Sequence, residues 1–150
     1  MIKIYIFADS YKHFETPIKE YKKRLWKDVQ IVKLKPSKKN TESEIIQDET
    51  LKIYEKIKTV NAYKIVLSPL WKNLGVHEFS KVLEDNIVFY PEIIFIIWWA
   101  YGLHYDYLQP LVNMQMSFGK STFPHAMVLT ILLEQIYRVV MIKKWSSYHK

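Results

Sequence analysis

The chain has 150 residues, of which 49% are hydrophobic and 25% charged, and its formal net charge is +7. This composition is typical of a folded globular protein, and the length predicts a single domain over residues 1–150. The absence of cysteine excludes disulfides and thiolate metal sites, and the five histidines show no HxxxH or HExxH spacing, so no metal site is expected.

The chain shows no sign of a membrane or export signal. Its first residues, MIKIYIFADS, do not combine a charged segment, a long apolar stretch and a small-residue cleavage site. The longest apolar run, residues 93–103, has 11 residues, well short of the roughly 20 that span a bilayer. We therefore expect a soluble, cytoplasmic protein without a membrane partner.

The positive charge is unevenly distributed. Residues 1–60 carry 14 Lys/Arg against 9 Asp/Glu, whereas residues 61–150 carry 8 against 6. The surplus gathers around residues 19–27 and 33–39, and it would attract a polyanion such as RNA over long range. A lysine-rich solvated surface explains the composition equally well.

The first half of the chain reads as two strands and two helices. Residues 2–7 alternate and are rich in β-branched and aromatic side chains, which predicts a strand, and residues 29–35 predict a second. Between them, Thr16 as N-cap and Pro17 at the first helical position predict a basic helix to about Trp26. After a polar loop, Thr41 and Glu44 match a capping box that opens a second helix.

The second half continues the alternation of strands and helices. We predict a buried strand at 63–68, a short helix at 76–83, an apolar strand at 93–97, a turn at 106–110 and a fifth strand at 114–118. A long helix over 124–142 and a polar tail over 143–150 follow. Strands that are apolar on both faces and alternate with helices predict an α/β fold, with a mostly parallel sheet covered by helices on both faces.

The helix predicted over 124–142 has almost no polar face. A helix that is apolar all round must be covered on all sides, and one sheet covers only one of them. This predicts a homodimer through the helix, with Leu132 and Ile136 in the interface. Glu134 and Arg138 are spaced to pair with each other. The alternative is a central helix of a monomer.

The C-terminal third carries a specific motif. Ser117-Phe-Gly-Lys-Ser-Thr-Phe-Pro-His125 is followed by Leu-Leu-Glu-Gln-Ile-Tyr-Arg138 and ends in Tyr148-His-Lys150. This pattern resembles the signature of the 23S ribosomal RNA pseudouridine-N3 methyltransferases of the SPOUT superfamily, and weaker similarity covers the rest of the chain. The resemblance implies a C-terminal trefoil knot, one of the rare exceptions to the rule that chains do not thread.

The resemblance also implies a cofactor and its site. S-adenosylmethionine would lie in the knot between three loops at the carboxyl ends of strands, where α/β sheets bind ligands. Carried over position by position, the cofactor-binding residues are Leu67, Trp98, Trp99, Gly102, Phe118, Gly119, Lys120, Ser121, Thr122 and Phe123.

Tyr148 and His149 are the candidate catalytic residues. Methyl transfer is an in-line displacement, so catalysis depends largely on positioning, and the proton on a uracil-like N3 must leave before or during attack. The resemblance implies that the two side chains face the RNA base, at the cofactor site of the partner subunit. Without it, they read as a disordered solvated tail. His125 is expected to cap or pack at the start of the long helix.

Five tryptophans depart from the family pattern. The family has Ile-Gly-Gly where this chain has Ile97-Trp98-Trp99, it has glycine in place of Trp71 and Trp145, and glycine is common at the position of Trp26. Glycine lets the backbone approach a ligand closely, which tryptophan does not. Since UGA is one base from a glycine codon and is read as tryptophan in some genetic codes, one hypothesis is that all five are glycine in the native protein. The alternative is a pseudoenzyme with an aromatic plug in a vacated pocket.

Three other departures are not explained by recoding. Leu129 stands where the family has arginine, Thr50 where it has glycine, and Asp9 or Ser10 where it has a glycine near the end of the first strand.

Three functions compete on this evidence. The first is a ribosomal RNA methyltransferase that uses S-adenosylmethionine, favoured by Tyr148 and His149. The second is a non-catalytic knotted dimer that binds ribosomal RNA or a ribosomal particle, favoured by Trp98 and Trp99 taken literally. The third is a dimeric scaffold whose basic face is incidental.

Overall fold

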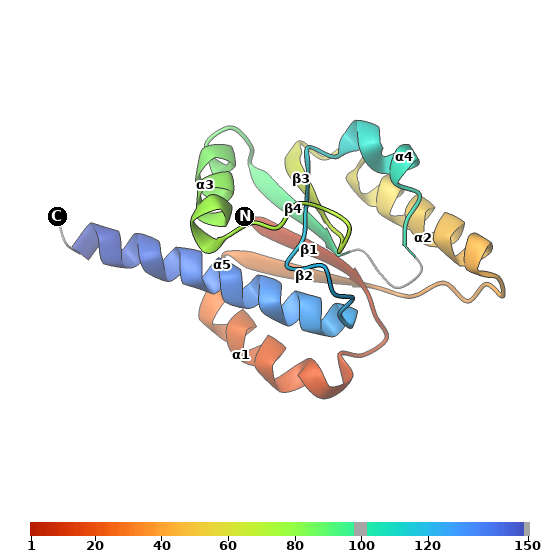
Figure 1. Cartoon of the computed structure of the whole chain (residues 1–150), viewed down its shortest axis with the longest axis horizontal. Helices are drawn as coiled ribbons and strands as arrows, with labels where there is room; N and C mark the ends of the chain where they lie inside the picture. Colours follow the sequence, from red (N-terminus) through yellow and green to blue (C-terminus); the bar gives the residue numbers. More distant parts are fainter. Residues whose placement is uncertain (98–101, 149–150) are drawn as a thin grey trace.

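A computed structural model describes residues 1–97 and 102–148 of the chain. Within them five strands form one sheet in the order β2-β1-β4-β3-β5, and every neighbouring pair is parallel (Figure 1). The strands are β1 (Ile2–Phe7), β2 (Val29–Leu34), β3 (Ala62–Leu67), β4 (Glu92–Ile97) and β5 (Met114–Met116). The predicted parallel sheet is confirmed.

Helices connect the strands and cover both faces of the sheet. They are η1 (Lys12–Phe14), α1 (Glu15–Leu25), α2 (Glu42–Ile57), α3 (Val76–Ile87), α4 (Tyr105–Leu108), η2 (Gln109–Leu111) and α5 (His125–Tyr148). Helices α1, α3 and α5 lie on one side of the sheet and α2 and α4 on the other (Figure 1).

Each face of the sheet packs into its own apolar core. Along β1, Ile4 and Ile6 enter the core shared with α1, α3 and α5, whereas Tyr5 and Phe7 enter the core shared with α2. Strand β4 divides in the same way, because successive side chains of a strand point to opposite faces. This double burial explains why the central strands are apolar without interruption.

Helix α1 begins differently from the prediction. The turn η1 runs directly into α1, so Phe14 is the N-cap and Thr16 lies inside the first turn. Phe14 makes no side-chain capping hydrogen bond. Pro17 is tolerated because the first N–H groups of a helix have no intrahelical partner. The helix ends at Leu25, with Trp26 as its C-cap.

Three further boundaries differ from the prediction. The expected turn at 106–110 is instead α4 followed by η2, anchored by the buried Leu108. Helix α3 continues to Ile87, four residues beyond the expected end. Its last turn is largely exposed and lacks the regular spacing of apolar residues that would predict a helix. Strand β5 ends at Met116, and Ser117 makes only an isolated bridge with Asn73.

Helix α2 begins as predicted and carries two buried polar side chains. Thr41 and Glu44 form the capping box. Further along, the Thr50 hydroxyl donates to the Ile46 carbonyl at 2.6 Å and accepts the His104 N–H at 2.9 Å. Thr50 therefore joins α2 to the chain that follows β4.

Glu49, one residue earlier, is also buried. One of its carboxylate oxygens accepts the Ser37 N–H at 2.8 Å, and the other has no hydrogen-bond partner among the described residues. Burial raises the pKa of the Glu49 carboxyl, although the Ser37 N–H and Lys52 oppose this change. The Glu49 side chain thus fixes the loop after β2 through a hydrogen bond, but its burial disfavours the ionised form of the carboxyl.

Helix α5 is longer than predicted. It runs for 24 residues from His125 to Tyr148, so the segment expected as a tail is helical as far as the structure describes it. At 1.5 Å per residue its length is about 36 Å. Its C-terminal end extends past the other elements (Figure 1).

By length and composition alone, residues 125–144 of α5 could cross a membrane, although 33% of the most apolar window is buried inside the fold. Searching the sequence for the longest uninterrupted apolar run missed this segment, because Thr130, Glu134 and Gln135 interrupt its apolar residues. A core helix of a soluble protein has the same properties, so this is weak evidence for a membrane span.

The buried Glu49 predicts how the stability of the protein changes with pH. Because the folded pKa of Glu49 is raised, its contribution to stability is full below the ordinary value of 4.5 and is lost as the pH rises through the folded pKa. Glu49→Gln keeps an acceptor for Ser37 and removes this loss. The melting temperature of the variant, compared with that of the parent protein, should therefore rise from acidic toward neutral pH.

Asp48→Asn is the matched control on the same helix. The Ser37 side chain, followed by Lys52, lowers the pKa of the Asp48 carboxyl, so its stabilisation is present at neutral pH and is lost as the pH falls. The melting temperature of this variant, compared with that of the parent protein, should therefore fall toward neutral pH. Parallel pH trends for the two variants would contradict the assignment.

Candidate functional site

Three strand ends meet at the carboxyl edge of the sheet. Strand β3 lies between β4 and β5, and its last residue, Leu67, is in register with Ile97 of β4 and with Met116 of β5. The chains that leave these three residues are the ones expected to hold the cofactor. Their juxtaposition is the observation on which the site depends, because ligands of parallel α/β sheets bind outside this edge.

The chain after β3 is tied to the chain after β5 by backbone hydrogen bonds. The Ser68 N–H donates to the Met116 carbonyl at 3.0 Å, and the Ser117 N–H donates to the Lys72 carbonyl at 3.0 Å. Residues 68–75 therefore run beside the start of the signature segment. These contacts have no side-chain signature, so the sequence could not have revealed them.

The signature segment is folded on itself. The buried Ser117 hydroxyl donates to the Gly119 carbonyl at 2.6 Å and also lies 3.1 Å from the Gly119 N–H. Phe118 packs edge-on against Phe79 of α3, with ring centroids 6.5 Å apart. Of the predicted residues within the described part of the chain, Lys120, Ser121 and Thr122 are exposed. The loop is thus anchored at its start and open at its centre.

Glycine has a clear backbone role at one predicted position. Gly102 has φ 83°, in the left-handed region that favours glycine. Trp98 and Trp99, the residues expected to contact the cofactor from the same loop, lie outside the described residues.

Two tryptophans can be located from their side chains. Trp71, in the chain after β3, is 39% exposed and packs against Tyr105 of α4 with ring centroids 5.6 Å apart. Trp26 is 76% exposed at the C-cap of α1, near a helix end where glycine is favoured. Trp71 thus borders the predicted site, and Trp26 lies at the opposite edge of the sheet.

The other departures from the family pattern fit the fold. Leu129 is fully buried in the apolar core between α5 and the sheet, where an unpaired arginine would be costly. Thr50 holds His104, as described above. Asp9 and Ser10 are exposed just after β1.

Tyr148, one of the two candidate catalytic residues, lies at the end of α5 farthest from this edge. Tyr148 is the last residue of α5, about 36 Å of helix away from His125, which is the last residue of the signature segment. His149 lies outside the described residues. His125 is half-buried, and burial together with the Lys12 ammonium lowers its pKa.

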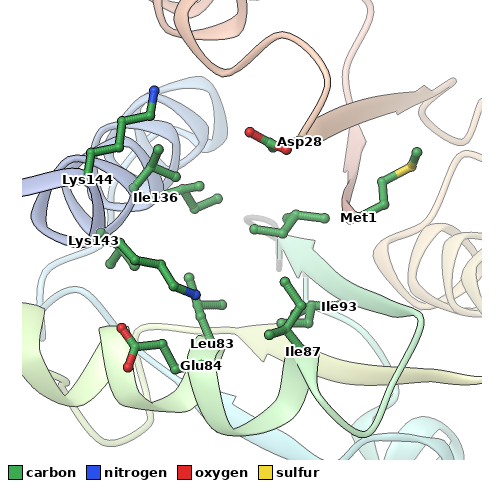
Figure 2. A pocket seen from close by; sticks show the side chains of 12 residues that line it. Met1, Asp28, Leu83, Glu84, Ile87, Ile93, Ile136, Lys143 and Lys144 are labelled. Carbon is green, nitrogen blue, oxygen red and sulfur yellow. The ribbon is translucent and has the colours of Figure 1, made fainter. Parts of the chain in front are cut away.

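A cavity of about 420 Å³ lies at the opposite, amino edge of the sheet. Its walls are mainly apolar side chains of β1, β4, α3 and α5, including Leu83, Ile93 and Ile136, with charged groups such as Glu84 and Lys143 beside it (Figure 2). Because the predicted cofactor loops leave the carboxyl edge, this cavity is not part of their site. No cluster of three metal-ligating side chains occurs among the residues that the structure describes.

Comparisons with known proteins identify the family of this chain. The model of a family described as "Predicted SPOUT methyltransferase" matches residues 1–149. Two curated relatives named "Ribosomal RNA large subunit methyltransferase H" are those of Clostridioides difficile, 38% identical over 148 residues, and Leuconostoc mesenteroides, 37% identical over 148 residues. One from Caldicellulosiruptor saccharolyticus is 32% identical over 144 residues.

Each of these alignments covers 93% of this chain and 92% of the relative. The similarity therefore includes the sheet, the three chains that leave its carboxyl edge, and α5. The protein belongs to the SPOUT methyltransferase family.

Proposed function

We propose that this protein transfers a methyl group from S-adenosylmethionine to N3 of a pseudouridine in large-subunit ribosomal RNA, as a cytoplasmic homodimer. The observation that carries the proposal is the register of Leu67 with Ile97 and Met116, which brings the chains after β3, β4 and β5 together. The names of the relatives support ribosomal RNA as the substrate.

The described residues at the carboxyl edge fit a nucleoside cofactor. Gly102 has the backbone conformation of a close turn, and a Cβ at Gly119 would meet only Phe123, at 3.7 Å. Gln115, on β5 next to this edge, carries a buried side-chain oxygen with no partner among the described residues. S-adenosylmethionine, when bound, supplies the methyl group on a sulfonium. Residues 68–75, the chain after β4 and residues 117–123 would hold it, within the trefoil knot that the family implies.

The reaction also requires a path for the N3 proton and a means of holding the base. Tyr148 and His149 are the proposed residues, since a phenol and an imidazole can accept or relay a proton. Because α5 separates Tyr148 from the loops of its own subunit by about 36 Å, the two residues would act at the site of a second subunit. Catalysis therefore depends on the dimer.

The uncovered side of α5 supports the dimer. Leu132 and Ile136, the side chains expected in the interface, are buried against the sheet and belong instead to the core. The opposite side of the helix carries Met127, Ile131, Glu134, Arg138 and Met141, which follow the alternating four- and three-residue spacing of a helix–helix seam. Glu134 and Arg138 form the predicted ion pair, so neither would be buried alone. We call these five residues the α5 seam.

A charge in the seam should separate the subunits. Ile131→Lys would place an unpaired ammonium in an apolar interface, at a cost of several kcal/mol, without entering the core of the subunit. Analytical ultracentrifugation should find a dimer for the parent protein and a folded monomer for the variant. Leu51→Lys is the matched control, because Leu51 is an exposed leucine of α2, on the other side of the sheet. A monomeric parent, or a dimeric Ile131→Lys, contradicts the proposal.

The tryptophans favour a second candidate function. Trp71 borders the site where the family has glycine, and an indole occupies volume that a glycine leaves to a ligand. With Trp98 and Trp99 also in the cofactor loop, the chain as written would be a non-catalytic dimer that binds ribosomal RNA. The two functions differ in cofactor affinity.

Calorimetry with S-adenosylmethionine separates the two candidates. We expect weak or no binding by the chain as written, and binding once glycine replaces all five tryptophans, because only glycine lets the loop backbone approach the cofactor. Trp26→Gly alone is the control and should change nothing, since Trp26 lies at the other edge of the sheet. Tight binding by the chain as written would refute the steric argument. No binding by the five-glycine variant would point to Leu129, Thr50 or Ser68 and favour the non-catalytic dimer.

The catalytic residues make a separate prediction. In a variant that binds the cofactor, His149→Ala and Tyr148→Phe should lower the rate of methyl transfer, by roughly 10²-fold or more for a lost proton acceptor. The affinity for S-adenosylmethionine should change far less. Mixed dimers can be formed from one subunit that carries His149→Ala and one that carries Gly102→Trp, both with Ile131 unchanged. If the tail acts across the dimer, one site should still work, because it combines the intact loop of the first subunit with the intact tail of the second. If the mixed dimer is as inactive as the dimers of each single variant, action across the dimer is refuted.

A further inference from the structure

The positive charge of this protein is concentrated in one stretch of the fold. Residues 9–40 carry ten Lys/Arg and four Asp/Glu, which gives +6 of the chain's net +7. The remaining residues are close to neutral. This stretch comprises η1, α1, β2 and the loop after β2, at the edge of the sheet formed by β2.

The lysines of this stretch are exposed and not paired with acids. None of them takes part in an ion pair among the described residues, whereas Lys3, Lys52 and Lys58 elsewhere do. The exposed lysines are Lys12, Lys19, Lys22, Lys23, Lys27, Lys33, Lys35, Lys38 and Lys39. We call these nine the basic face.

The part of the basic face on α1 points away from α5. Tyr21 and Arg24 mark the side of α1 that meets α5, because the Tyr21 ring lies 6.0 Å from the Tyr137 ring and the Arg24 guanidinium lies 5.5 Å from the same ring. With 3.6 residues per turn, Lys19, Lys22 and Lys23 project from the other side. A second subunit on the α5 seam would therefore leave them uncovered.

The basic face reaches the edge of the sheet that carries the candidate site. Lys12 lies in η1, just after β1, close enough to His125 at the start of α5 for its charge to lower the histidine pKa. The loop after β2 leaves the same edge, three strand spacings, or roughly 14 Å, from the chain after β3. The eleven residues of α1 extend the face by about 16 Å toward the opposite edge.

The composition of α1 favours RNA over a membrane surface. A helix that lies on a bilayer needs a free apolar face beside its lysines. The apolar side chains Ile18 and Leu25 of α1 are buried in the core instead. A row of lysines without an apolar face is suited to successive phosphates of a nucleic acid backbone.

We propose that the basic face holds the RNA backbone next to the target nucleotide and directs that nucleotide to the carboxyl edge of the sheet. This inference rests on the proposed function for the identity of the RNA. It adds a docking surface on η1, α1 and the loop after β2, separate from the cofactor loops and from the α5 seam. Lysines bind phosphates as point charges, so the surface would position the RNA without reading its sequence.

The test compares two triple variants with the same loss of charge. The first is Lys19→Ala with Lys22→Ala and Lys23→Ala. The control is Lys56→Ala with Lys58→Ala and Lys81→Ala, which removes exposed lysines from the last turn of α2, from its C-cap and from α3. Fluorescence anisotropy would measure the affinity for a labelled RNA hairpin and for purified large ribosomal subunits at a series of salt concentrations. Circular dichroism and ultracentrifugation would check folding and the dimer.

We expect the α1 variant to bind both RNA probes at least about tenfold more weakly at low salt, with a shallower salt dependence, because fewer counterions are released. The control should stay close to the parent protein. Equal losses in the two variants would show a diffuse field rather than a docking surface and would overturn the proposal. Unchanged RNA affinity of the α1 variant, or its loss of binding to anionic lipid vesicles in place of RNA, would also overturn it.

The proposed methyltransferase function can fail independently. Methyl transfer by the five-glycine variant, combined with unchanged RNA affinity on loss of the α1 lysines, would support the function and refute the surface. RNA binding that depends on these lysines without any methyl transfer would support the surface and favour the non-catalytic dimer.

Discussion

The position of β3 between β4 and β5 is the constraint on which the candidate site depends. Parallel pairing of Leu67 with both Ile97 and Met116 makes three chains leave the sheet side by side. Strand β5 has only three residues, and the link between Asn73 and Ser117 extends the association beyond it. Without this pairing, the signature segment that follows β5 would not meet the chains from β3 and β4.

Helix α5 links this edge to the rest of the protein. Its first residue is the last of the signature segment, one side of it fills the core against the sheet, and its C-terminal end extends past the other elements (Figure 1). The α5 seam on its outer side is the surface that the proposed dimer would cover. The length of α5 separates Tyr148 from the carboxyl edge of its own sheet, which is why the proposed function assigns Tyr148 to the site of a partner. The core and the proposed site and dimer thus all depend on this single helix.

The departures from the family pattern differ in physical character. Leu129 and Thr50 are well accommodated, one in an apolar core and the other in a hydrogen bond to His104. Of the tryptophans whose side chains are described, Trp71 lies in the chain after β3 and Trp26 at the end of α1, places where glycine is useful for its backbone and its small volume. Substitutions that the fold absorbs and substitutions that fill a ligand's space have different consequences, and the second kind bears more directly on cofactor binding.

The sequence by itself determined the layered α/β fold, the five strands and the capping box of α2, because alternation, apolar runs and capping residues are local signals. The signature around Ser117–His125 located the family and the loops of the candidate site. Tertiary structure decided which side of α5 is core, since Leu132 and Ile131 are equally apolar and differ only in what they face. It also decided the start of α1, where η1 replaces a side-chain cap, and the separation of Tyr148 from the cofactor loops. These features depend on contacts between distant segments, which no local pattern of residues encodes.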